Sequence, residues 1–338
     1  MTPAPVSVSV LDLAPVGSDS TPAQALRDSV RLAREAEALG YHRYWFAEHH
    51  DVASVASCSP AVLIAAAAGV TTTLRVGSGG VMLPNHPPLV VAEQFGTLAA
   101  LHPGRIDLGI GRAPAADPAV ASALRRPATE DFPAQLGELL RYFGHRGDDE
   151  SSVSAVPALG SSPAPWLLGV SPRSAALAGM LGLPFAYAHH INPRAARASL
   201  DVYRSTFRPT DRLPAPHTVI SVGAVCAETD EAARRLAAPA SLLYVRLRQG
   251  DRDRPLPSPQ EAADHPYTAE EAALVAAQSA GRFVGSPATV RAGIEELLAL
   301  SDADELMITT QVSGAAERLR SYALLAEAFS LGRAAVVA

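Results

Sequence analysis

The sequence of 338 residues predicts an α/β protein that folds as one (β/α)8 barrel. Short apolar segments alternate with helical patterns along the chain, an order that joins parallel strands through right-handed crossovers. These strand-like segments number eight, as such a barrel requires. An open, doubly wound sheet is the alternative, because a count of strands does not establish closure.

The expected strands are short and apolar, and most precede a helical pattern. They span 6–11, 44–47, 74–76, 106–110, 166–168, 185–187, 218–225 and 305–308. The first helix is predicted by Thr21 as N-cap, Pro22 at the first helical position and Gly40 beyond the end. Further helices are predicted at about 60–69, 88–101, 174–181, 194–207, after 225, and at 315–331.

Composition and charge exclude several classes of protein. The 28 basic residues are all arginine, and 34 acidic residues give a net charge of −6, so a nucleic-acid-binding protein is not expected. The lack of lysine excludes Schiff-base and P-loop chemistry. Two cysteines indicate a reducing compartment. Neither a membrane span nor a secretory signal is visible, so a cytoplasmic location is expected.

Two segments interrupt the alternation of strands and helices. Residues 144–165 are polar and rich in serine and proline, which favours a surface excursion. Residues 249–268 hold charged residues followed by Pro255, Pro257 and Pro259, without periodicity, which favours a lid, although a surface insertion is nearly as compatible. The whole chain, 1–338, is interpreted as one domain carrying these two excursions.

Glu48, His49 and His50 form the densest cluster of reactive side chains. They follow an expected strand, and residues at that position lie at the active face of a parallel barrel. An imidazole beside a carboxylate suits proton transfer near neutral pH. A zinc site and a purely structural cluster are alternatives. Adjacent histidines in extended backbone point apart, and no H-E-x-x-H motif is present, so no metal is predicted.

Other strand ends carry candidate ligand-binding residues. Gly79 and Gly80 allow backbone to approach a flat ligand, and Gly111-Arg112 offers a guanidinium for a phosphate. A surface arginine is the alternative for Arg112. Val170-Ser171 and Ser174 form a strand-to-helix turn that suits an anion and also suits ordinary helix capping. His189 follows the sixth expected strand. No G-x-S-x-G serine-hydrolase motif occurs.

Several blocks together resemble the bacterial luciferase-like flavin monooxygenases. The most specific are 44–50 (YWFAEHH), 75–86 (RVGSGGVMLPNH), and 92–95 with 103–112 (AEQF, PGRIDLGIGR). The resemblance continues at 182–184 (GLP), 281–287 (GRFVGSP) and 304–309 (DELMIT), so it covers nearly the whole chain. It implies a TIM barrel, reduced FMN delivered by a separate flavin reductase, O2 as co-substrate, and a homodimer.

The resemblance also implies roles for individual residues. His49 matches the catalytic histidine, and Glu48 a carboxylate beside the flavin. Gly79-Gly80 matches a non-proline cis peptide beneath the flavin ring. Residues matching phosphate-binding or flavin-contacting positions are Arg112, Val170, Ser171 and Ser174. Gly111 replaces the reactive cysteine of luciferase, and His189 replaces a tryptophan beside the flavin; both departures imply a non-luminescent relative.

The expected activity is therefore an FMN-dependent monooxygenase. The resemblance implies that a C4a-(hydro)peroxyflavin transfers one oxygen atom to an organic substrate, and a tailoring step in secondary metabolism is one interpretation. A deazaflavin (F420)-dependent oxidoreductase on the same barrel is an alternative. A flavin carrier without turnover is another.

Overall fold

A computed structural model describes residues 6–112, 117–126, 131–144 and 153–332, and shows a closed barrel of eight parallel strands. The last strand pairs with both the first strand and the seventh barrel strand, which closes the ring. The predicted (β/α)8 barrel is therefore confirmed. Its strands in spatial order are β1 (Ser7–Asp12), β2 (Arg43–Phe46), β3 (Arg75–Ser78), β5 (Ile106–Gly111), β6 (Ala164–Gly169), β7 (Phe185–Ala188), β8 (Thr218–Cys226) and β10 (Glu305–Thr309).

Two further strands were not expected from the sequence. β4 (Val81–Met82) pairs with the end of β5, and β9 (Arg282–Gly285) pairs with Gly223–Cys226 of β8. β8 is nine residues long because its first part pairs with β10 and its last part with β9. Segments of two and four residues are too short to show a strand periodicity in sequence.

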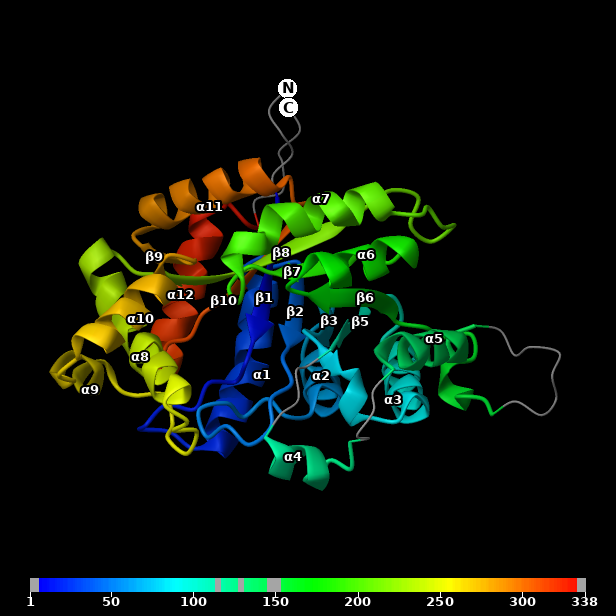
Figure 1. The fold of residues 1–338 in the computed structure, drawn as a ribbon, viewed down its shortest axis with the longest axis horizontal. Helices are drawn as coiled ribbons and strands as arrows, with labels where there is room; N and C mark the ends of the chain where they lie inside the picture. The colour runs from blue at the N-terminus through cyan, green and yellow to red at the C-terminus, as the bar shows by residue number, and fades with distance from the viewer. Residues whose placement is uncertain (1–5, 113–116, 127–130, 145–152, 333–338) are drawn as a thin grey trace.

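Helices surround the barrel, with α1, α2 and α3 below it and α7 and α11 above it in Figure 1. Most begin with proline at the first or second helical position, where its missing N–H costs nothing. They are α1 (Pro22–Ala38), α2 (Pro60–Gly69), α3 (Pro88–Leu101), α4 (Pro118–Ala123), α5 (Phe132–Tyr142), α6 (Pro172–Met180), α7 (Ala196–Thr206), α8 (Asp230–Arg248), α9 (Pro259–Asp264), α10 (Ala269–Ser279), α11 (Pro287–Ser301) and α12 (Ala315–Ala328).

The two excursions are more ordered than the sequence indicated. The segment 249–268 contains α9, which is capped by the Ser258 hydroxyl, so the prediction of an irregular segment was wrong there. Leu256 pairs with the segment after β1 and is buried. In the other excursion, 145–152 lie outside the described residues, whereas Ala155 and Ala158 are buried. Ala158 packs so closely on Gly96 of α3 that no side chain fits at position 96.

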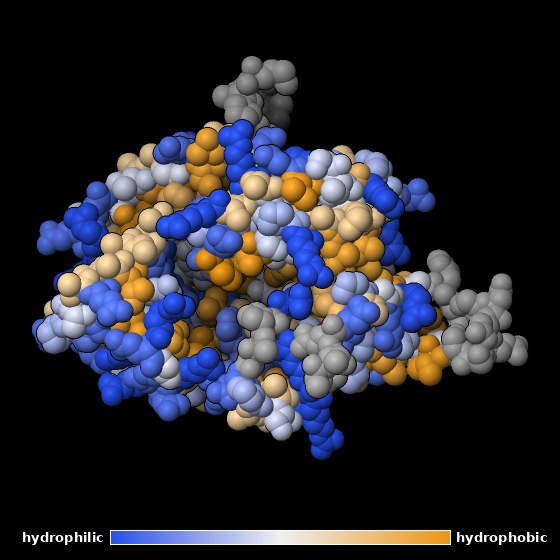
Figure 2. All heavy atoms as spheres, viewed as in Figure 1, coloured by the Kyte–Doolittle hydropathy of each residue, from blue (hydrophilic) through white to orange (hydrophobic). Residues whose placement is uncertain are grey.

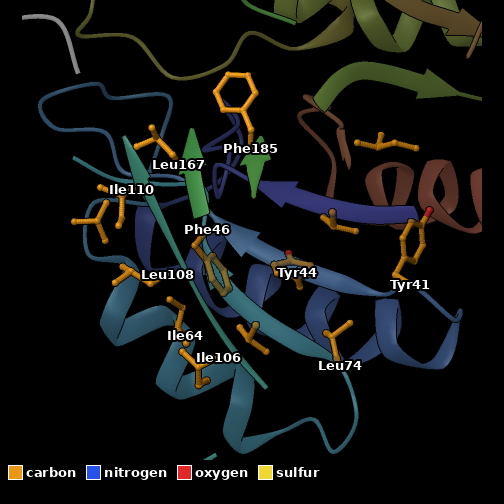
Figure 3. Close-up of a cluster of buried hydrophobic side chains, with 14 of the residues drawn as sticks. Tyr41, Tyr44, Phe46, Ile64, Leu74, Ile106, Leu108, Ile110, Leu167 and Phe185 are labelled. Carbon is orange, nitrogen blue, oxygen red and sulfur yellow. The ribbon is translucent and has the colours of Figure 1, made fainter. Parts of the chain in front are cut away.

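Side chains alternate along each strand between the helices and the barrel interior. Those pointing outward form the large core between strands and helices, part of which is shown in Figure 3: Tyr44, Phe46, Ile106, Leu108, Ile110, Leu167 and Phe185. Those pointing inward include Leu11, Trp45, Trp166, Val219 and Met307, which pack together inside the ring. The barrel is thus a filled scaffold, and open space for a ligand lies at its ends.

A buried ionic network occupies the end of the barrel where the strands begin. Arg43 donates hydrogen bonds to Glu305 at 2.8 and 2.9 Å and to Asp107 at 2.8 Å. Arg75 also pairs with Asp107, and His217 lies 2.9 Å from a Glu305 oxygen. In barrels of this kind the N-terminal face serves stability, whereas ligands bind at the other face.

Candidate active site

At the C-terminal end of the barrel, the backbone of Gly79, Gly80 and Gly109 forms a surface that we call the glycine floor. Cβ atoms built at Gly79 and Gly80 would lie 2.5 Å from the Leu11 side chain and 2.8 Å from the Gly109 carbonyl oxygen. At Gly109, a Cβ would lie 2.0 Å from the Ser78 carbonyl oxygen. The peptide bond between Gly79 and Gly80 is cis, as the resemblance implied. A surface without side chains of this kind suits a flat ring system.

Glu48 follows β2 and is buried under four hydrogen-bond donors. Its Oε1 lies 2.9 Å from Nε2 of His50, 2.8 Å from Nε2 of His86 and 3.4 Å from Nδ2 of Asn85. Its Oε2 accepts from the backbone N–H of Met82 at 3.0 Å. Burial alone would raise the pKa of Glu48, but these hydrogen bonds lower it. The ionised carboxylate therefore joins the end of β2 to the segment after β3.

His49 points away from this cluster. Its backbone N–H donates to the Ser57 carbonyl at 2.9 Å, whereas its side-chain Nδ1 is buried without a hydrogen-bond partner. Burial lowers the pKa of His49, a shift that Glu48 opposes and His50 reinforces. The imidazole is consequently neutral near pH 7, with a ring nitrogen available to a ligand. The predicted divergence of His49 and His50 is confirmed.

Two histidines follow β7, and the second of them, His190, lies close to His49. The buried Nδ1 of His189 has no hydrogen-bond partner, and burial lowers the pKa of this residue. His190 Nδ1 lies 3.1 Å from both the carbonyl and the hydroxyl oxygen of Ser221. Burial lowers the pKa of His190 to about 4, reinforced by the nearby His189, Arg282 and His49. Three neutral imidazoles therefore follow β2 and β7 at the same end of the barrel as the glycine floor.

The predicted anion-binding residues lie on two adjacent strand ends. Arg112 directly follows Gly111 at the end of β5, is exposed and forms no ion pair with any residue that the structure describes. Ser171 and Ser174 form a capping box at the start of α6, with each backbone N–H 3.4 Å from the other residue's hydroxyl oxygen. Because β5 pairs with β6, these groups lie next to each other on the C-terminal rim of the barrel.

The turn that carries these serines is fixed from both sides. A Cβ at Gly169 would lie 2.0 Å from the Ser174 hydroxyl oxygen, so only glycine fits there. The Val170 carbonyl accepts from Asn192 Nδ2 at 3.1 Å and from Tyr187 at 3.3 Å. The capping interpretation holds. Because Pro172 has no N–H and the Ser174 N–H donates to Ser171, an anion here would rely on the serine hydroxyls and the backbone N–H of Arg173.

Sequence reasoning missed several partners of these residues. His86 lies in the segment 75–86, which carries part of the family resemblance. Nothing in the linear sequence shows that His86 contacts Glu48. Arg282 and Gln311, which line a cavity beside His190, were assigned no role. Within the described ranges, no three His, Cys, Asp or Glu side chains come together to hold a metal ion. No helix in the same ranges is both long and apolar enough to span a membrane.

Comparison with known proteins identifies the family. Residues 6–304 match the model of the luciferase-like monooxygenases. A luciferase-like monooxygenase of Escherichia coli (strain K12) is 43% identical over 327 residues, covering 96% of this chain and 97% of that protein. N-acetyl-S-alkylcysteine monooxygenase of Bacillus subtilis (strain 168) is 31% identical, covering 96% and 98%. The crystal structure of apo-MsnO8 has a TM-score of 0.89 at 42% identity, covering 96% and 98%.

More distant structures share the fold. The oxygenating constituent of 3,6-diketocamphane monooxygenase from Pseudomonas putida, in complex with FMN, is 21% identical with a TM-score of 0.71, covering 96% of this chain and 97% of that chain. A coenzyme F420-dependent tetrahydromethanopterin reductase from Methanopyrus kandleri is 15% identical with a TM-score of 0.64, covering 96% and 98%. The extended match of sequence and fold shows that this chain belongs to the luciferase-like monooxygenase family.

Proposed function

We propose that this protein is an FMN-dependent monooxygenase, which uses reduced FMN and O2 to insert one oxygen atom into an organic substrate. The observation that carries the proposal is the glycine floor at the C-terminal end of the barrel, the same end at which the buried Nδ1 atoms of His49 and His189 have no hydrogen-bond partner among the described residues. When bound, reduced FMN supplies the electrons that activate O2. The protein's task is to hold the ring, the phosphate and the protons in place.

The phosphate of FMN is assigned to the C-terminal ends of β5 and β6. Arg112 would pair with the phosphate, and the hydroxyls of Ser171 and Ser174 would hydrogen-bond to it. The ring would then extend over Gly79 and Gly80 toward His189. Gly111 leaves room beside this path, because a Cβ there would meet nothing closer than 3.8 Å.

His49 is assigned the handling of protons beside the reacting oxygen. Its neutral imidazole can accept a proton near pH 7, and no residue that the structure describes competes for its buried Nδ1. Glu48 is assigned a positioning role, since both of its oxygens already accept hydrogen bonds. Leu256 ties the segment 249–268 to the residues after β1, and we propose that this segment covers the bound substrate and excludes water.

Two features of the proposal concern partners. Reduced FMN would come from a separate flavin reductase, as the family resemblance implies. The protein is proposed to form a homodimer through α2, whose residues Val62, Ala65, Ala66 and Gly69 form an exposed apolar stripe without any charged side chain. A spacing of three and four residues places these positions on one side of the helix.

Binding of reduced FMN is the direct test. Quenching of protein fluorescence under anaerobic conditions should show saturable binding to the wild type. Arg112→Gln should weaken binding by about tenfold or more, the usual effect of removing a charge-assisted hydrogen bond. Arg197→Gln is the matched control, because Arg197 is a surface arginine of α7 with 75% of its side chain exposed. Absence of binding to the wild type would refute the proposal.

The deazaflavin alternative and the carrier alternative have separate signatures. A deazaflavin oxidoreductase transfers hydride and should consume no O2. A carrier should retain FMN without substrate-dependent O2 uptake. The relative named N-acetyl-S-alkylcysteine monooxygenase, 31% identical along nearly its whole length, supports oxygenation over both alternatives.

A further inference from the structure

A cavity of about 410 Å³ lies beside the predicted flavin site, between β8, α8, β9 and α10. His190, Gly223 and Thr309 line its barrel side, at the C-terminal ends of β7, β8 and β10. A recess between α10 and the barrel is visible in Figure 2. The cavity therefore adjoins the face where the imidazoles of His49 and His189 lie.

Most of the cavity wall is apolar. Helix α8 contributes Ala237, Ala240 and Leu243, and β9 contributes Val284. Such a wall favours a hydrocarbon or aromatic group over a highly polar one. The wall is interrupted by a few polar side chains, among them Arg282 and Gln311.

Arg282 is a half-buried guanidinium that has no carboxylate partner among the described residues. Its Nη2 donates one hydrogen bond of 3.3 Å to Gln311 Oε1, and among the residues that the structure describes it forms no ion pair. Its stem lies over Gly223, where a Cβ would be 3.5 Å from Cγ of Arg282. Burial lowers the pKa of Arg282 to about 10, so the group still carries its charge near pH 7.

Two arginines that are buried, Arg43 and Arg318, show what a structural guanidinium looks like in this protein. Arg43 pairs with Asp107 and Glu305, and Arg318 pairs with Asp12. Burial alone would lower the pKa of each arginine, but these carboxylates raise the pKa above its ordinary value. A guanidinium that is partly removed from water and has no carboxylate partner gains little stability from its position, so these structural pairs do not explain Arg282.

The phosphate of FMN does not account for Arg282. Arg112 and the serines of α6 lie at the ends of β5 and β6, whereas Arg282 lies against β8, with β7 between β6 and β8. The guanidinium is thus a second anion position, placed in an apolar cavity beside the reaction site.

We propose that Arg282, supported by Gln311, binds the carboxylate of the organic substrate, while the apolar part of the substrate lies against α8 and β9. The substrate class is therefore an organic acid with a hydrocarbon or aromatic body. This inference rests on the proposed oxygenation of an organic substrate at this face. The planar guanidinium suits a carboxylate because it can donate two parallel hydrogen bonds.

The test is a binding measurement without flavin, using octanoate and octanamide as probes of equal chain length. Isothermal titration calorimetry of the wild type should give a dissociation constant for octanoate at least about tenfold lower than that for octanamide. This is the difference expected for a charge-assisted hydrogen bond. Arg282→Met should remove that preference, whereas the surface variant Arg197→Met should keep it. Since Met fills similar volume without a charge, Arg282→Met should also unfold at the same or a higher temperature than the wild type.

Three results would overturn the inference. One is equal affinity of the wild type for the two probes, which needs no variant. Another is an unchanged preference in Arg282→Met. The last is a lowered unfolding temperature of Arg282→Met, which would show that the arginine stabilises the fold. The comparison of octanoate with octanamide does not involve flavin. A failure to bind reduced FMN would therefore refute the proposed function without changing the outcome of this comparison.

Discussion

The carboxylate of Glu48 lies 2.8 Å from Nε2 of His86, and this contact joins the ends of two barrel strands. Glu48 follows β2, and His86 follows β4, in the segment that begins with the cis Gly79-Gly80 peptide. The same carboxylate accepts from Met82 in that segment and bonds to His50 on its own side. Glu48 thereby fixes the glycine floor relative to His49.

Replacing Glu48 with glutamine should destabilise the protein. An amide has one acceptor oxygen where the carboxylate has two, so at least one buried donor among Met82, His50 and His86 is left without a partner. We expect a loss of about 1–3 kcal/mol in the free energy of unfolding, measured with urea. Glu228→Gln is the control, because the Glu228–Arg320 pair is exposed and a surface ion pair contributes little to stability. Equal losses in both variants would contradict the assigned role.

Replacing His49 with alanine should slow the reaction while leaving the fold intact. Loss of a positioned proton acceptor costs about 10²–10⁴-fold in rate. The rate at which the bound reduced cofactor and substrate consume O2 is the measurement, with His102→Ala at the end of α3 as control. Because burial lowers the pKa of His49, the neutral form persists below its ordinary pKa of about 6.5, and activity should fall only as the pH drops through that lowered value. A wild-type rate in His49→Ala would remove this residue from the mechanism.

The barrel could be predicted because its strands carry a strong local pattern. Buried apolar runs such as those of β5 and β8 are followed at regular spacing by helices with serine or threonine caps and early prolines. The missed elements have weaker signals. β4 has two residues and β9 has four, and β9 exists only because the end of β8 extends beyond the barrel to pair with it.

The candidate site was predictable in its residue types but not in its contacts. The position of Glu48 and His49 after a strand was enough to place both at the active face. That Glu48 accepts from His86, and that Arg282 meets Gln311 and no described carboxylate, depend on residues distant in sequence. Partners of that kind are set by the register of parallel strands and by helix packing, which a single sequence does not specify.

The network around Glu305 should make stability fall in acid. Burial alone would raise the pKa of Glu305, but hydrogen bonds from His217 and Arg43 hold it at about 2. A carboxyl with a depressed pKa stabilises the fold above its unfolded value of about 4.3, and that contribution is lost as pH falls toward 2. Glu305→Gln should cost about 3–5 kcal/mol at pH 7, since Arg43 loses a buried partner. The difference from the wild type should shrink below about pH 4; a difference independent of pH would contradict the assignment.

A charge on the apolar stripe of α2 should dissociate the proposed homodimer. Val62 is 66% exposed, and the helix has no charged residue to keep its outer surface hydrated. In a dimer formed through this stripe, Val62→Glu would bury an unpaired carboxylate, which is costly, and the protein should become monomeric. Light scattering coupled to size-exclusion chromatography measures the mass directly. Leu300→Glu on α11 is the matched control, because Leu300 is 58% exposed on another helix. A wild type that elutes as a monomer would refute the proposed dimer. A Val62→Glu variant that stays dimeric would show that α2 is not the interface, because an unpaired carboxylate cannot remain buried there at no cost.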